Sequence, residues 1–295
     1  MRLHIEHTTV YTYERPVTFG RHRLVLRPRE GHDLRVERMQ LRITPDHSLM
    51  WTRDVFGNSI ALVDWLEPSD TLTIVNDVVV ERMSPFPART FHEPWRVPFP
   101  PRYDPLEVAI TSVYQAPGFL EDAAHVQAWV ARELAPQPHD AEGTMQALCN
   151  LVFRTIAYQR RTEKGVQNPA KTLELKTGSC RDMATLMMEA ARHLGVAARF
   201  SSGYLHGTAS LAGRASTHAW TEVYLPTLGW RGFDPTLGRA ISLQHVVTGV
   251  SSHPRGVMPV SGAFTGTRAD CRSLLVTVKT EVLPAAEEAA APAAR

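Results

Sequence analysis

The stretch Lys176-Thr-Gly-Ser-Cys-Arg-Asp-Met183 puts a cysteine at the predicted start of a helix. Ser179 and Asp182 have the spacing of a capping box, in which Ser179 is the N-cap and Asp182 reaches back to its amide. Apolar residues then follow one helical stripe as far as Gly195, a residue type that commonly ends helices. Cys180 is therefore expected in the first turn of this helix, where unpaired backbone amides favour a thiolate.

Two later segments offer a base and a carboxylate. Thr217-His-Ala-Trp-Thr-Glu-Val-Tyr224 alternates as a strand does and carries His218 near its start. Gly229-Trp-Arg-Gly-Phe-Asp-Pro-Thr236 predicts the returning strand of a hairpin that ends at Asp234, because proline cannot continue the hydrogen-bonded ladder. The chain thus supplies a thiol, an imidazole and a carboxylate, the groups of a cysteine-nucleophile site.

The expected register of the hairpin leaves the contact between base and carboxylate indirect. The turn is predicted at residues 226–229, from the sequence Pro-Thr-Leu-Gly. Pairing Leu225 with Trp230 would set Asp234 opposite Thr221. The carboxylate would then reach the histidine only along a diagonal or across a bulge.

Each of the three residues also has a simpler explanation. Cys180 could be only a small residue at a helix start, His218 a structural histidine at a strand edge, and Asp234 a turn-capping residue. A metal site built from the three side chains is another alternative, although no closely spaced pair of ligands supports it. A peptide-binding module without catalytic activity is a further possibility.

Composition limits the classes of partner and compartment. The 295 residues can form one large domain or two ordinary ones. A net charge of +2 gives no indication of a nucleic-acid or membrane partner, and no apolar run of about 18 residues predicts a membrane span. The alternating N-terminus has no signal-peptide core, so we expect a cytoplasmic protein.

The three cysteines are widely spaced, which argues against a disulfide framework or a zinc knuckle. Cys149 falls within an apolar helical pattern and is expected to be a buried core thiol. A reducing compartment would keep Cys180 available as a thiol.

The chain divides into four parts by composition. Residues 1–83 hold short β-rich runs separated by turn residues, which predict an N-terminal β-sandwich. Residues 84–105 contain seven prolines and several aromatic residues, which predict an extended connector packed on a surface. Residues 106–283 mix helical periodicity with strand-like runs, the last at 274–278, and predict an α+β core with helices packed on an antiparallel sheet. Residues 284–295 form a low-complexity tail that we expect to be disordered.

Four motifs in order resemble the core of the bacterial transglutaminase-like superfamily; they lie at residues 176–182, 202–204, 217–224 and 229–236. The resemblance extends from about residue 145 to about residue 280. Residues 1–83, with Arg27-Pro-Arg29 and Asp54-Val-Phe-Gly-Asn58, also resemble the β-sandwich domain that precedes this core in one bacterial subgroup.

This resemblance implies a fold related to papain-like cysteine proteases, with Cys180 as nucleophile, His218 as base and Asp234 as its orienter. It implies acyl transfer from a protein or peptide amide through a thioester, with no cofactor. Water could resolve the thioester as an amine does, so protease or amidase activity stays open. The backbone amide of Cys180 is a candidate oxyanion donor, and Tyr158 and Gln159 are candidates for the second donor.

Overall fold

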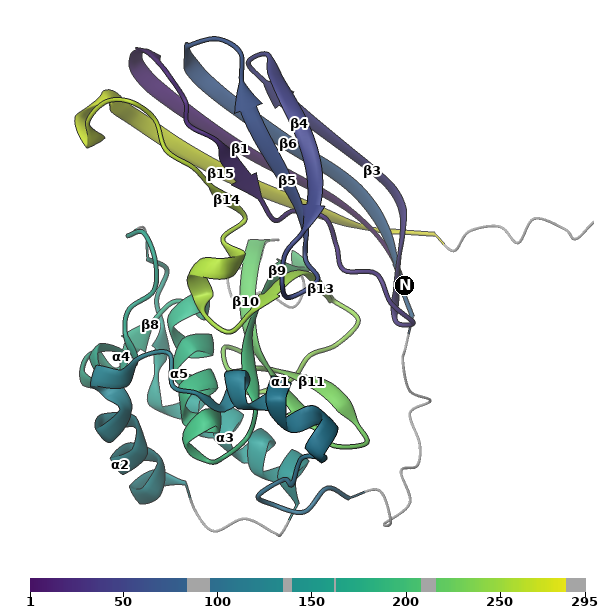
Figure 1. The fold of residues 1–295 in the computed structure, drawn as a ribbon, viewed down its shortest axis with the longest axis vertical. Coiled ribbons are helices and arrows are strands. Elements are labelled where there is room, and N and C mark those ends of the chain that lie inside the picture. Colours follow the sequence, from purple (N-terminus) through teal and green to yellow (C-terminus); the bar gives the residue numbers. More distant parts are fainter. Residues whose placement is uncertain (84–95, 135–139, 162, 208–215, 285–295) are drawn as a thin grey trace, which may run out of the picture.

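The computed structural model describes residues 1–83, 96–134, 140–161, 163–207 and 216–284. In these residues a β-sandwich lies against a body of helices packed on a sheet (Figure 1). The predicted α+β class, with an N-terminal β-sandwich, is confirmed. None of the helices in these ranges combines the length and apolar character that a bilayer span requires.

Two four-stranded antiparallel sheets form the sandwich. The first has the order β15-β1-β6-β3, with bounds β1 Arg2–Val17, β3 Leu34–Thr44, β6 Ser69–Arg82 and β15 Cys271–Leu283. The second has the order β14-β2-β5-β4, with bounds β2 His22–Leu24, β4 His47–Arg53, β5 Ser59–Trp65 and β14 Val260–Ser261. In β1 every second side chain from Leu3 to Thr9 is buried, the alternation expected of a strand with one covered face.

The last strands of the chain return to the sandwich, which corrects the predicted extent of the core, residues 106–283. β15 pairs with β1 along nearly its whole length, and β14 pairs with β2. Figure 1 shows the yellow C-terminal strand beside the purple N-terminal one. An alternating strand fits the edge of any antiparallel sheet, so the run at 274–278 could not indicate its partner.

The predicted connector is described only in part. Residues 84–95 and 285–295 lie outside the described residues, so the disordered tail and most of the connector stay predictions. In the remainder of the connector, Val97 is buried and Phe99 packs against the apolar core of the helices and sheet.

The core consists of a five-stranded sheet and the helices beside it. The sheet has the order β12-β11-β10-β9-β13, with bounds β9 Ala198–Leu205, β10 Ser216–Leu225, β11 Gly229–Asp234, β12 Arg239–Ala240 and β13 His245–Ser251. The α-helices are α1 Pro105–Gln115, α2 Ala123–Glu133, α3 Ala141–Thr155, α4 Pro169–Leu175 and α5 Cys180–His193. Short 3-10 turns lie at η2 Leu120–Asp122, η4 Pro254–Val257 and η5 Arg268–Asp270.

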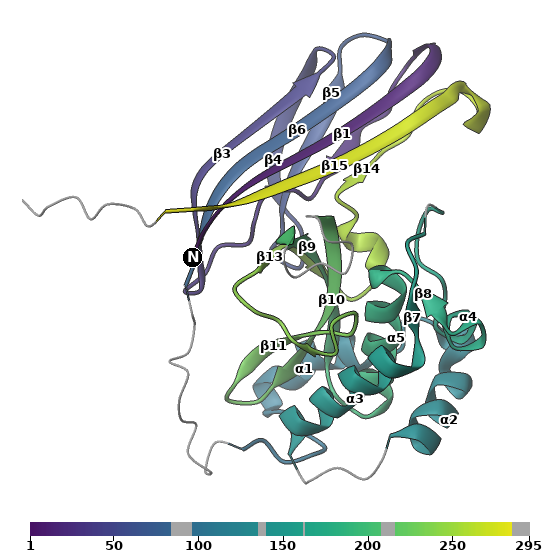
Figure 2. The ribbon, with the colours of Figure 1, turned by 180° about the vertical axis from the view of Figure 1, so that it is seen from behind.

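Helix α5 is the centre of this core. Every residue from Asp182 to Arg192 is buried, and Figure 2 shows α5 between the sheet and the outer helices. Its apolar side chains pack on α2, α3 and the sheet in one cluster. Burial on all sides holds the start of α5, and with it Cys180, in a fixed place relative to β10.

A separate apolar cluster joins the sandwich to the core. It combines Leu3, Ile5 and Val78 of the sandwich with Tyr204 of β9 and Val246 of β13. A buried polar contact accompanies it, because Nδ1 of His7 lies 3.0 Å from the hydroxyl of Tyr204. The sandwich is therefore packed on two strands of the sheet that carries His218.

Candidate active site

Cys180 is the first residue of α5, as the capping box predicts. The backbone amide and the hydroxyl of Ser179 both donate to Oδ2 of Asp182, each at 2.8 Å. The predicted helix end is also confirmed, since Gly195 follows α5 with a left-handed φ of 78°. The amide of Cys180 thus belongs to the first turn, whose amides have no partner inside the helix. The residue Cys180 is partly exposed.

Asp182 also anchors the segment that precedes the helix. Its carboxylate is fully buried and accepts hydrogen bonds from the Arg161 guanidinium at 2.8 and 2.9 Å. It accepts another from the backbone amide of Gln167 at 2.7 Å. These contacts satisfy the buried carboxylate and fix the loop beside Cys180.

A short parallel pair of strands places Tyr158 next to the nucleophile. β7, Ala157–Tyr158, pairs with β8, Thr177–Gly178, just before α5. The backbone amide of Gln159 donates to the Gly178 carbonyl at 2.8 Å, so this amide is engaged in the pairing. Burial raises the pKa of Tyr158, and the neighbouring Cys180 adds to the shift. Of the two candidate second donors, Gln159 has its backbone amide engaged, whereas Tyr158 lies close enough to Cys180 for the two groups to interact.

The β10–β11 hairpin has a register one residue away from the expected one. Leu225 pairs with Gly229, so the predicted pairing with Trp230 is wrong. The turn is one residue shorter because Thr227 adopts a left-handed φ of 68°, which is uncommon for a β-branched residue. All pairs shift by one, and Asp234 comes one position closer to the histidine.

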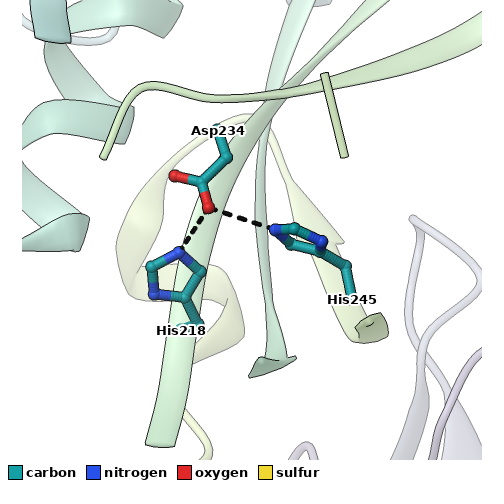
Figure 3. Close-up of side chains that lie close together, drawn as sticks. All are labelled: His218, Asp234 and His245. Atoms are coloured by element: carbon teal, nitrogen blue, oxygen red, sulfur yellow. Dashed lines mark hydrogen bonds and ion pairs between the residues drawn. The ribbon is translucent and has the colours of Figure 1, made fainter. Parts of the chain in front are cut away.

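His218 and Asp234 are in direct contact in the structure. Nε2 of His218 lies 2.7 Å from Oδ2 of Asp234 (Figure 3). The other carboxylate oxygen, Oδ1, accepts the amide of Thr236 at 2.9 Å and its hydroxyl at 2.6 Å. Asp234 is fully buried and His218 is 7% exposed, so the pair is shielded from water.

The electrostatics of this pair favour a charged imidazole. Burial lowers the pKa of His218, but attraction to Asp234 and hydrogen bonds with Asp234 and Cys180 outweigh it and raise the pKa to about 10. Burial likewise opposes ionisation of Asp234, but His218 and His245 lower its pKa. The stabilisation from a raised histidine pKa is complete below the ordinary value and is lost as the pH rises through the folded value. The structure thus brings His218 and Asp234 into direct contact and places Cys180 close enough to His218 to raise the pKa of the imidazole.

His245, the first residue of β13, is a member of the site that sequence reasoning missed. Its Nε2 lies 3.1 Å from the same Oδ2 of Asp234, and the side chain is buried (Figure 3). The chain has 13 histidines, and the segment around this one carries no motif. Thr236 was missed too, although it lies within the quoted motif and follows Asp234 by two residues.

The spacing of three of these side chains is also compatible with a metal ion. His218, Asp234 and His245 offer ligand atoms that all lie within 4.8 Å of one another. The set differs from the one considered in the sequence, since Cys180 is not part of it. Both Nε2 atoms are already hydrogen-bonded to Oδ2, and a metal ion would have to replace both contacts. We therefore interpret the set as hydrogen-bonded side chains.

The other two cysteines have different surroundings. Cys149 is fully buried in the helical core, and burial raises its pKa well above the ordinary value. This confirms the prediction of a core thiol. Cys271 begins β15 opposite Tyr13 and is partly buried.

Comparison with protein families bears out the resemblance of both parts of the chain. Residues 3–81 match the bacterial transglutaminase-like N-terminal region. Residues 127–235 match the transglutaminase-like superfamily. The second match includes Cys180, His218 and Asp234, whereas His245 lies beyond its end.

Several relatives match the chain over nearly its full length. An uncharacterized protein of Mycobacterium tuberculosis is 26% identical over 96% of this chain and 93% of its own. One of Mycobacterium leprae is 25% identical over 94% of this chain and 98% of its own. A solved structure from Cytophaga hutchinsonii, described as a proposed cysteine protease, has a TM-score of 0.73 at 15% identity, over 96% of this chain and 92% of that one. That similarity shows a shared fold.

Proposed function

Because the chain joins a bacterial transglutaminase-like N-terminal region to a transglutaminase-like core, we propose that it transfers an acyl group from a protein or peptide amide to Cys180. A fold hosts many activities, so the proposal depends on the site. The observation that carries it is the direct contact of His218 with the buried Asp234, with Cys180 close enough to His218 to raise the pKa of the imidazole.

The proposed reaction proceeds in two steps. The Cys180 sulfur forms a bond to the amide carbon, and His218 gives a proton to the nitrogen as the carbon–nitrogen bond breaks. Ammonia or an amine leaves, and a thioester remains. An acceptor amine or water then attacks the thioester carbon while His218 takes its proton, and the carbon–sulfur bond breaks, which releases the product and frees the Cys180 thiolate. Asp234 holds the ring so that one nitrogen faces the thiol throughout.

The developing oxyanion requires donors that are already in place. The backbone amide of Cys180 is one, since it lies in the first turn of α5. We propose the phenol of Tyr158 as the second, because β7 brings it beside the start of that helix.

Hydrolysis is the second candidate outcome, and the partial exposure of Cys180 favours it. Cys180 is partly exposed, so water can reach a thioester there unless a second substrate covers it. The name of the Cytophaga hutchinsonii structure, a proposed cysteine protease, points the same way. In either case the substrate class is a protein or peptide; action in the cytoplasm remains a prediction.

The test is incubation with a glutamine-containing peptide, with and without a primary amine, followed by mass spectrometry of the peptide. Transamidation adds the mass of the amine less ammonia, deamidation adds about one mass unit, and cleavage gives two fragments. A Cys180→Ala variant of the same chain is the control. An unchanged peptide with the wild-type protein, over a range of peptides, would count against catalysis and in favour of a peptide-binding module.

A further inference from the structure

Asp234 is shared between two histidines at a single oxygen atom. Oδ2 lies 2.7 Å from Nε2 of His218 and 3.1 Å from Nε2 of His245 (Figure 3). The histidines come from different strands, β10 and β13, and both are buried. Two donors on one acceptor oxygen affect each other, so the strength of one contact depends on the other.

The surroundings of His245 decide which of its nitrogens carries the proton. The backbone amide of Ser242 donates to Nδ1 at 3.2 Å, so Nδ1 is an acceptor. A neutral imidazole then has its proton on Nε2. Burial lowers the pKa of His245, which favours the neutral ring. His245 therefore presents an uncharged N–H group to Asp234.

Packing holds the ring of His245 in this orientation. The fully buried Trp220 meets it edge to face, with ring centroids 5.3 Å apart. Gly203 of β9 makes room for this arrangement, because a Cβ there would lie 3.0 Å from the Trp220 ring and 2.0 Å from the Val246 carbonyl oxygen. At this point the approach of β13 to β9 therefore requires a glycine at position 203.

Other titratable groups face these residues from several elements. Arg82 of the sandwich acts on His245 together with Asp234 and His218. Cys180 acts on His218, and Asp234 influences both Cys149 of α3 and Tyr158 of β7. These are the groups whose charges influence His245, His218 and Asp234 when position 245 is changed.

We propose that His245 is a positioning residue, whose Nε2–H holds the Asp234 carboxylate and limits how strongly that carboxylate attracts His218. This role rests on the proposed function only in that His218 is the base of the reaction. A purely structural histidine would stabilise β13 without affecting the protonation of His218.

The test compares two substitutions, each of which can keep only one of the two contacts of the His245 ring, the one to Asp234 or the one to Ser242. In His245→Gln the side-chain amide can occupy the place of Nε2 and still donate to Asp234. In His245→Asn it can occupy the place of Nδ1 near Ser242 but does not extend to Asp234. Thr248→Val is the control, because Thr248 is buried in the same strand and donates to the Ser202 carbonyl, away from Asp234.

Two measurements are made on each variant, neither of which needs a known substrate. One is the pH dependence of Cys180 alkylation by iodoacetamide. The other is the titration of the His218 ring by nitrogen-15 NMR in a Cys180→Ala background. In His245→Asn, Asp234 loses a competing donor, so we expect the His218 ring to titrate at higher pH. The alkaline limit of the pH profile of Cys180 alkylation should move to higher pH with it. Alkylation near neutral pH should be retained, because the charged imidazole that favours the Cys180 thiolate is held more strongly.

His245→Gln should restore most of the wild-type profile, and Thr248→Val should leave the profile unmoved even if stability falls. The proposal is overturned if His245→Asn titrates as wild type, or if Thr248→Val shifts the profile equally. Because the NMR arm requires no turnover, its result separates this proposal from the proposed function. A shift in the titration of the His218 ring, without any peptide turnover, would support the positioning role and count against acyl transfer.

Discussion

Asn58 of the sandwich binds both backbone groups of Val250 in β13. Its Nδ2 donates to the Val250 carbonyl at 2.8 Å, and the Val250 amide donates to its Oδ1 at 2.9 Å. Asn58 is fully buried, and Arg29 donates to the same Oδ1 at 2.7 Å. This strand, β13, begins with His245. The sandwich therefore contacts the same strand whose first side chain is hydrogen-bonded to Asp234.

Asn58→Ala should destabilise the whole chain. It leaves the amide and carbonyl of Val250 buried without this partner, at a cost of about 2–5 kcal/mol in the free energy of unfolding. Urea denaturation measures this loss. Val55→Ala in the same loop is the control, because Val55 is 93% exposed and should change stability by less than about 0.5 kcal/mol. Equal stability of the two variants would show that the contact is unimportant.

A limiting dose of iodoacetamide near neutral pH should label Cys180 ahead of the other cysteines. Cys180 is partly exposed beside His218, whereas Cys149 is fully buried and its pKa is raised. Peptide mapping after labelling identifies the modified residue. Preferential labelling of Cys149 or Cys271 would contradict a reactive Cys180.

Substitutions of Cys180, His218 and Asp234 should reduce turnover to different extents. Cys180→Ala should abolish it, because no other side chain takes the place of the nucleophile. His218→Ala should be nearly as severe, and Asp234→Asn milder, since an amide can still contact the ring. The measurement is kcat/KM on any amide substrate found.

The losses in this series should not add. The double variant Cys180→Ala with His218→Ala should be little worse than Cys180→Ala alone, because the two residues act as a unit. Turnover that survives in well-folded Cys180→Ala would mean that the reaction takes place elsewhere.

His7 should make the chain sensitive to acid. Burial lowers the pKa of His7 from 6.5 to about 4, so the unfolded chain binds its proton more readily between these values. The free energy of unfolding should therefore fall as the pH drops through this window, by about 3 kcal/mol from this group. Urea denaturation at about pH 7 and about pH 4 measures the fall. In His7→Gln the fall should be smaller by that amount, and an identical fall in both proteins would refute the assignment.

Local features of the site could be predicted because they depend on residues close in sequence. Ser179 and Asp182 are three positions apart, and their capping box fixes the start of α5 wherever the helix packs. The hairpin after His218 was also predictable, but its register was not. Thr227 adopts a left-handed backbone conformation that the turn sequence did not indicate.

Patterns along the chain were enough to predict the helix that presents Cys180, the strands of His218 and Asp234, and the resemblance that joins them into one site. Packing between strands far apart in the chain brings His245 to Oδ2 of Asp234 and sets β15 beside β1, and neither contact could be predicted. The physical reason is the same in both cases. Strand alternation specifies which face of a strand is buried, but it does not specify the neighbouring strand, and a histidine in a strand carries no signal of the carboxylate that packing will bring to it.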